Sequence, residues 1–447
     1  MKAELKVDFS KITGRIKPMH AVGQPPMIGL NSDYMHYLTE AHIPYTRLHD
    51  VGGPFGGAMF VDIPNIFRNF DADENDPKSY DFAFTDGLIK AIFDAGCQPI
   101  YRLGVTIENY ANVKAYHIYP PKDYKKWASI CEHIVRHYNE GWADGFNYGI
   151  EYWEIWNEPE DGPNNEMWLG TDVEYFELYD ITSKRLKECF GNSIKVGGYA
   201  SCNLEGILQT PERFGLDIEP QEKNYRYYFL EYAEKFFSYI REHKSPIDFF
   251  SWHSYSSLEN NCLISEGIQA LLKMYGYEGL ETQLNEWNNA HQIEYRGTAF
   301  AAANAAAFML AMQDRPTDIM CYYDAGITVF QFGGMFNPLN YTPLPLYYAF
   351  KAFGELYVLG NQAESILCVN ENLFVQSAVS NDGNRKAVMI ANIGDDCEIS
   401  VGEELKGFTK YLVDKENSLA DTGKAEDVIL IKRNQVILLG EHAMKTE

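Results

Sequence analysis

The stretch that decides the fold runs from residue 149 to residue 159 and reads GIEYWEIWNEP. In its first eight residues bulky apolar side chains alternate with polar or aromatic ones, a pattern that predicts a buried strand. Pro159 cannot continue the strand, and it is expected to hold Glu158 in an extended conformation at the strand's C-terminal edge. Carboxylates at that edge of a parallel barrel usually carry chemistry. Glu158 is therefore the first candidate for a functional residue.

Strand and helix signals alternate on both sides of this stretch. Seven further strands are expected over residues 19–22, 45–50, 98–104, 194–199, 247–253, 279–286 and 318–325. Helical signals fall between and after them, over residues 31–41, 82–95, 121–139, 173–190, 225–243, 264–275, 298–312 and 344–356. This alternation predicts a parallel (β/α)₈ barrel.

The pattern changes after Gly360. Short alternating segments, separated by Asn, Asp and Gly, cover residues 373–377, 387–392, 428–432 and 435–439. They predict an accessory β-sandwich, which the strand expected near the N-terminus can join. A chain of 447 residues suits two such parts. We expect a catalytic barrel over residues 18–358 and a β-sandwich domain from residues 1–17 plus 359–447.

The net charge limits which partners are expected, and the cysteine pattern indicates the cell compartment. A formal net charge of −25 makes nucleic acid and anionic membrane poor partners. The first ten residues hold no apolar run and no stretch approaches ~20 apolar residues, so neither a secretory signal nor a membrane span is expected. The eight cysteines are scattered without a Cys-x-x-Cys pair. This arrangement favours a reducing cytoplasm and gives no sign of a zinc site.

A second carboxylate, Glu286, ends the strand expected over residues 279–286. The strands of Glu158 and Glu286 are the fourth and the seventh of the barrel and face each other, so both side chains point into one cleft. Two carboxylates in one cleft suit glycosidic bond cleavage, because one protonates the leaving oxygen while the other attacks the anomeric carbon. A separation of about 5–5.5 Å implies retention of configuration and ~6.5–9.5 Å implies inversion, and the sequence leaves both open.

Four motifs in this order resemble glycoside hydrolase family 39, which holds β-xylosidases and α-L-iduronidases. They are RLHD at residues 47–50, WNEP at 156–159, HSY at 253–255 and NEW at 285–287. The resemblance spans essentially the whole chain. It implies a retaining exo-glycosidase, most similar to a β-xylosidase, with Glu158 as acid/base, Glu286 as nucleophile and no metal or cofactor. Members often assemble through the accessory sandwich, so a homo-oligomer is considered, although the residues themselves do not require one.

The resemblance also implies which side chains bind the sugar. Asn157 would bind the 2-hydroxyl, and His49 would contact the sugar in the −1 subsite. His253 and Tyr255 match a His-x-Tyr motif whose tyrosine sits by the nucleophile, and Trp287 would flank that nucleophile.

Arg47 is expected to orient Glu286 and to keep it ionised. The alternative is that Arg47 forms a buried structural ion pair with Asp50, which ends the same strand. Arg47 and Asp50 are both counted among the candidate substrate-binding residues.

One departure from the family concerns the floor of the sugar pocket. The family's xylosidases carry a Trp and a nearby Glu around the eighth strand, whereas this strand ends in Cys321-Tyr322-Tyr323-Asp324-Ala325. Tyr323 and Asp324 are expected either to touch the sugar or to be structural. Trp168 is expected either to anchor its loop or to serve as a platform for the aglycone.

The substrate is expected to be a small oligosaccharide or glycoside. Because the pocket floor departs from the family, the sugar is left open between xylose and an arabinoside, galactoside or uronide. The alternative from another class is a catalytically silent carbohydrate-binding protein.

Overall fold

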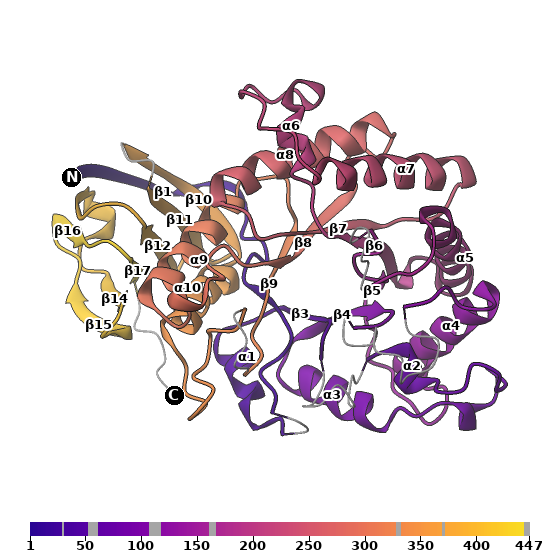
Figure 1. The fold of residues 1–447 in the computed structure, drawn as a ribbon. Coiled ribbons are helices and arrows are strands. Elements are labelled where there is room, and N and C mark those ends of the chain that lie inside the picture. The colour runs from indigo at the N-terminus through magenta and orange to yellow at the C-terminus, as the bar shows by residue number, and fades with distance from the viewer. Residues whose placement is uncertain are drawn as a thin grey trace.

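The structure is a computed structural model that describes residues 1–28, 31–51, 61–106, 118–160, 167–327, 332–368 and 372–441. Eight parallel strands close into a barrel (Figure 1). Each strand overlaps one of the eight expected from the sequence, so the predicted barrel is confirmed. The strands are β2 (Ala21–Gly23), β3 (Tyr45–Leu48), β4 (Gln98–Leu103), β5 (Tyr152–Ile155), β6 (Lys195–Ser201), β7 (Phe249–Ser254), β8 (Glu281–Trp287) and β9 (Ile319–Tyr322).

Helices connect the barrel strands and cover the outside of the barrel (Figure 1). They are α1 (His36–Glu40), α2 (Ile63–Ile66), α3 (Ala83–Asp94), α4 (Tyr124–Glu140), α5 (Asp172–Phe190), α6 (Gly206–Gln209), α7 (Tyr227–His243), α8 (Leu258–Met274), α9 (Ala299–Met312) and α10 (Pro345–Leu359). Helix α8 begins before the expected residue 264, because Ser257 caps it by accepting a hydrogen bond from the Asn260 N–H. Among the described residues, no helix is long and apolar enough to cross a membrane.

The second part of the molecule is a nine-stranded mixed sheet in the order β15-β14-β17-β12-β11-β10-β1-β13-β16. Strand β1 (Lys2–Arg15) pairs antiparallel with β10 (Asn361–Cys368) and parallel with β13 (Cys397–Val401), so the N-terminal strand joins the C-terminal sheet as expected. The others are β11 (Leu373–Val379), β12 (Lys386–Asn392), β14 (Thr409–Val413), β15 (Ser418–Lys424), β16 (Val428–Ile431) and β17 (Gln435–Gly440). The sequence did not predict β10, β13, β14 and β15.

The sheet curls around a core of its own and packs on the barrel with its other face. Leu5, Ile399 and Ile437, from strands spread across the sheet, share one apolar cluster. In β12, Val388 belongs to this cluster while its neighbour Met389 belongs to the cluster of the barrel, as the alternation of side chains along a strand requires.

Helices α9 and α10 lie between the barrel and β11, β12 and β17, and the small alanine side chains of α9 allow a close approach. The domain boundaries at residues 18 and 358 stay a prediction.

Candidate active site

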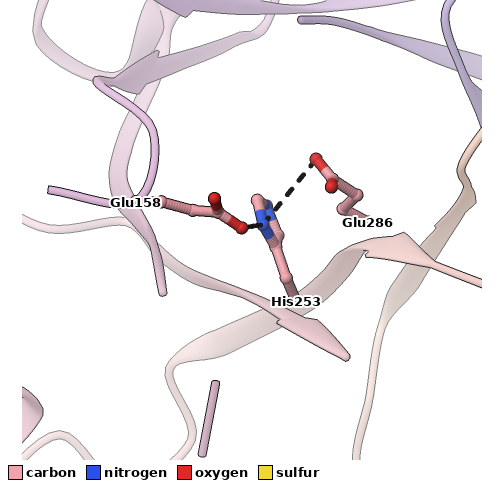
Figure 2. A group of neighbouring side chains, drawn as sticks. All are labelled: Glu158, His253 and Glu286. Carbon is pink, nitrogen blue, oxygen red and sulfur yellow. Dashed lines mark hydrogen bonds and ion pairs between the residues drawn. The ribbon is translucent and has the colours of Figure 1, made fainter. Parts of the chain in front are cut away.

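Three side chains from different strands meet at the C-terminal end of the barrel (Figure 2). Glu158 follows β5, His253 lies in β7 and Glu286 lies in β8. The Nδ1 atom of His253 is 2.6 Å from Oε1 of Glu158 and 3.7 Å from Oε2 of Glu286. A carboxylate oxygen of Glu158 lies within 4.8 Å of one of Glu286. An approach this close agrees with the separation of about 5–5.5 Å between carboxyl groups that is typical of retaining glycosidases.

The backbone leaves the barrel strands through left-handed conformations. Asp50, Trp156, Glu158 and Ala200 have φ of 53°, 73°, 44° and 58°. Each follows β3 or β5, or lies near the end of β6, and the N–H of Glu158 donates to the Ala200 carbonyl at 3.1 Å. Such conformations cost non-glycine residues about 1–3 kcal/mol each and concentrate at functional sites. The expectation that Pro159 holds Glu158 extended was wrong, since the chain turns at Glu158 to aim the carboxylate at the cleft.

A bulge in β8 decides which side chains of the NEW motif face the barrel interior. The pairing register shifts between Leu284 and Trp287. Asn285 and Glu286, although consecutive, therefore both reach the interior, and Trp287 points outward onto Phe308 and Phe350. Trp287 is fully buried there, so the expected contact of its indole with the nucleophile's surroundings is corrected: its side chain packs between the strand and the helices.

Arg47 holds three acceptors beneath the cleft. Its Nε donates to Glu154 Oε2 at 2.8 Å, Nη1 to Glu286 Oε2 at 3.1 Å and Nη2 to Asn157 Oδ1 at 2.6 Å. The guanidinium is 1% exposed, which makes each of these contacts strong. Because Asn157 turns its oxygen to Arg47, its amide N–H groups point away from the guanidinium.

The second oxygen of Glu286 is held from another side. Tyr255 donates its hydroxyl hydrogen to Glu286 Oε1 at 2.5 Å. Glu286 is thus fixed by a cation at one oxygen and a phenol at the other, and its side chain is 9% exposed. The sequence predicted both neighbours, and the structure places both in contact with the carboxylate.

Glu158 lies in a setting that favours its protonated form. Burial raises the pKa of Glu158 to about 7, although the charge of Arg47 and a hydrogen bond with Cys202 both lower it. Burial also lowers the pKa of His253 to about 4, so the imidazole is neutral near pH 7. The Glu158–His253 contact is therefore a hydrogen bond that tolerates a proton on either partner.

The comparison with known proteins identifies the family to which these residues belong. Residues 4–292 match the glycosyl hydrolases family 39. The chain belongs to glycosyl hydrolase family 39. It is 23% identical to a β-xylosidase from Geobacillus stearothermophilus over 373 residues, which cover 72% of this chain and 67% of that protein. The expected family, and with it a retaining glycoside hydrolase, is thereby confirmed.

Two solved structures share the fold of this family 39 chain. A glucosidase from Croceicoccus marinus superposes with a TM-score of 0.76 at 19% identity, covering 98% of each chain. A β-xylosidase of the same family from Caulobacter crescentus superposes with a TM-score of 0.69 at 17% identity, covering 98% of this chain and 99% of that one. At such identities the likeness concerns the fold alone, and it includes the accessory sheet.

The strand ends opposite Glu158 carry a second cluster of polar side chains. His49 Nε2 lies 3.1 Å from Asp50 Oδ1, and Tyr323 donates its hydroxyl hydrogen to Asp50 Oδ2 at 2.6 Å. Burial holds the pKa of His49 well below its usual value and raises that of Asp324 to about 7. Besides burial, the charge of Glu286 contributes to raising the pKa of both Tyr323 and Asp324, so these two residues lie near it. Contact of the four residues with the sugar stays a prediction.

Trp168 anchors its loop, which is the structural one of its two expected roles. Its side chain is 1% exposed, and its Nε1 donates to the Thr171 carbonyl at 3.1 Å. Its ring meets Trp156 and Tyr175 at centroid distances of 5.1 and 5.8 Å. The indole anchors the start of α5 instead of offering a face to an aglycone, so the expected platform is corrected.

The sequence analysis missed residues that organise the site. Glu154 is fully buried and accepts from Arg47 and, at 2.5 Å, from Asn285 Nδ2. A charged residue at an alternate position of an apolar strand was the available signal for Glu154. Glu160 accepts from Ser201 Oγ and the Cys202 N–H, both at 2.8 Å, and burial raises its pKa well above the usual value. Nothing in the local sequence marks Cys202.

Proposed function

We propose that this glycoside hydrolase removes a terminal sugar from a short oligosaccharide or glycoside by double displacement, with Glu286 as nucleophile and Glu158 as acid/base. The close approach of the two carboxylates, which bring one oxygen each within 4.8 Å, is the observation that carries the proposal. It is supported by their different surroundings, because two carboxylates with two roles need environments that separate their protonation states.

In the first step the Glu286 carboxylate attacks the anomeric carbon while Glu158 gives its proton to the leaving oxygen. Arg47 and Tyr255 each hold one oxygen of Glu286, which fixes its direction of attack. Asn157, whose oxygen is held by Arg47, offers its amide N–H groups to the 2-hydroxyl, a contact that strengthens as positive charge develops on the sugar ring.

In the second step Glu158, now ionised, takes a proton from water as that water attacks the glycosyl-enzyme. His253 lies 2.6 Å from Glu158 and can donate to the carboxylate in this state. Bond cleavage then restores Glu286 as a carboxylate beside Arg47. Two successive inversions give a product with the configuration of the substrate.

We propose xylose as the sugar, because the curated relative is a β-xylosidase. A uronate would need a cation to meet its carboxylate. Arg47 is engaged by three acceptors and Arg102 pairs with Asp62 at 2.7 Å, so a uronate would depend on Arg296, whose charge already acts on Asp324. An arabinoside or a galactoside would be cleaved by the same mechanism. It would differ from a xyloside only in its contacts with the pocket around Tyr323 and Asp324.

A panel of 4-nitrophenyl glycosides tests this proposal. We expect turnover of the β-xyloside to exceed that of the arabinoside, galactoside and glucuronide, and ¹H NMR to show the β-anomer as the first product. Turnover should persist after dialysis against EDTA, because no step uses a metal. A first product of opposite configuration, or activity that EDTA removes, would contradict the mechanism. Sugar binding without turnover of any glycoside would identify a silent carbohydrate-binding protein instead.

The pH dependence of kcat/KM reports the protonation of Glu158. Its pKa is raised to about 7, so the acid is lost as the pH rises through that value. We expect kcat/KM for a glycoside with a poor leaving group to fall above about pH 7, approaching tenfold per pH unit. Glu158→Gln should abolish this alkaline limb. Asp324→Asn is the matched control, since the pKa of Asp324 is also about 7; a limb that disappears with Asp324 and not with Glu158 would refute the assignment.

We also propose a cytoplasmic location. The eight cysteines are all thiols outside any disulfide, including the exposed Cys368, which is typical of a reducing compartment. Short glycosides that enter the cell would then be the substrates. Assembly into a homo-oligomer stays a prediction.

A further inference from the structure

A cavity of about 430 Å³ adjoins the acid/base on one side. Glu158 and Tyr255 contribute to its wall, and Glu286 is not among its lining residues. In a double displacement the sugar lies between the two carboxylates and the leaving oxygen lies beside the acid. A cavity that borders Glu158 and not Glu286 is therefore on the leaving-group side of the scissile bond.

The outer wall of this cavity is aromatic. Tyr225, Tyr228 and Phe229, at the start of α7, line it. Phe229 is buried and lies under the two tyrosines, with ring centroids 6.4 Å from Tyr225 and 5.7 Å from Tyr228. Tyr225 is 75% exposed and Tyr228 36% exposed, so both rings are accessible to a bound group, with the Arg226 guanidinium 6.0 Å from the centre of the Tyr225 ring.

Several polar groups of the same wall are already engaged with one another. Arg226 donates to the carboxylate of Glu205, and Asn203 Oδ1 accepts from the Glu205 N–H at 2.7 Å. A second sugar in this cavity would bring several hydroxyls, and each one buried without a partner costs about 1–3 kcal/mol. A flat aromatic group makes no such demand, and it gains from contact with tyrosine faces.

We propose that this cavity binds a flat aromatic leaving group, such as a phenol linked to the sugar, against Tyr225 and Tyr228. The inference rests on the proposed function, because it takes Glu158 as the residue that protonates the leaving oxygen. It adds the aglycone class and assigns the determinants of specificity to the start of α7, away from the sugar pocket.

Two donors with the same sugar and good leaving groups of different size test the proposal. The 4-nitrophenyl glycoside fills the cavity, and the glycosyl fluoride leaves it empty. For the variant Tyr225→Ala/Tyr228→Ala we expect kcat/KM to fall about tenfold or more with the nitrophenyl donor, from two lost aromatic contacts, and to stay within about twofold with the fluoride. Tyr225→Phe/Tyr228→Phe keeps both rings and should keep both rates. Phe84→Ala, which removes a 46% exposed ring from α3, is the control for loss of an exposed aromatic.

Three outcomes would overturn the proposal. An equal loss with both donors would mean that the tyrosines support the fold or the sugar site. A loss confined to the (1→4)-linked disaccharide of the same sugar would make the occupant a second sugar. Equal saturation-transfer NMR signals from 4-nitrophenol with the wild-type protein and with the double alanine variant would show that the rings bind no aromatic group. This last measurement needs no turnover, so it separates failure of the cavity proposal from failure of the proposed function, which would appear as no hydrolysis of any donor.

Discussion

Replacing Glu286 with alanine is expected to lower kcat for aryl glycosides by about 10⁵-fold, or about 7 kcal/mol of transition-state stabilisation. The variant has no group to form the glycosyl-enzyme. Water cannot take the place of Glu286, because the rest of the site positions the sugar for direct attack by a carboxylate. Arg47 keeps Glu154 and Asn157 as partners, so the variant should fold. Steady-state kinetics together with thermal unfolding measure both effects.

Adding sodium azide to the Glu286→Ala variant tests the nucleophile assignment more directly. Azide fits the space that the carboxylate leaves, and it should restore part of the turnover while forming a glycosyl azide of the opposite anomeric configuration, since only one displacement then occurs. Glu294→Ala, which removes an exposed carboxylate after the same strand, is the matched control and should keep normal kinetics. Near-normal turnover by Glu286→Ala, or an azide product with retained configuration, would be incompatible with Glu286 as the nucleophile.

Replacing Arg47 with methionine is expected to lower the free energy of unfolding by about 3–5 kcal/mol. Methionine fills a similar volume but leaves the buried Glu154 and Glu286 without their shared cation. The midpoint of urea unfolding measures this loss. Arg241→Met, at an exposed position of α7, should change stability by no more than about 0.5 kcal/mol.

The same variant separates a structural from a positioning role of Arg47. We expect kcat/KM of the folded protein to fall about 10²–10³-fold, because Glu286 and Asn157 both lose the group that orients them. Arg47→Lys keeps the charge but cannot reach three acceptors at once, so it should recover more stability than activity. If Arg47→Met lost stability while its folded fraction kept normal kinetics, the arginine would be structural only.

The barrel and the order of its functional strand ends could be predicted because both follow from short-range patterns. Alternation marks a buried strand, and the polar residue after each strand falls at one rim whatever the details of the loops. Glu158, His253 and Glu286 were found in this way. Strand β15 was missed for the opposite reason: it lies at the edge of the sheet, and Ser418–Lys424 is largely exposed and polar, with little apolar pattern to read.

The direction of a side chain at the site could not be predicted from the same patterns. Glu158 lies before a proline and yet has φ of 44°, because the contact of its N–H with Ala200 fixes a conformation that local preference disfavours. Trp287 faces away from the cleft because one bulge reverses the alternation after Leu284. Both features depend on neighbouring strands, and a single segment does not encode them.

The pairing of β1 with β10 places the first strand of the chain beside a partner made much later. Arg15 pairs with Asn361, so this contact joins two residues that are 346 positions apart in the sequence. At a synthesis rate of about 5–20 residues per second, the ribosome completes β10 roughly 20–70 s after β1. During that interval a strand with three buried apolar positions, Ala3, Leu5 and Val7, has no sheet to enter. Strand β1 therefore stays unpaired on this side until β10 has been synthesised, and its apolar face is open in the nascent chain during that time.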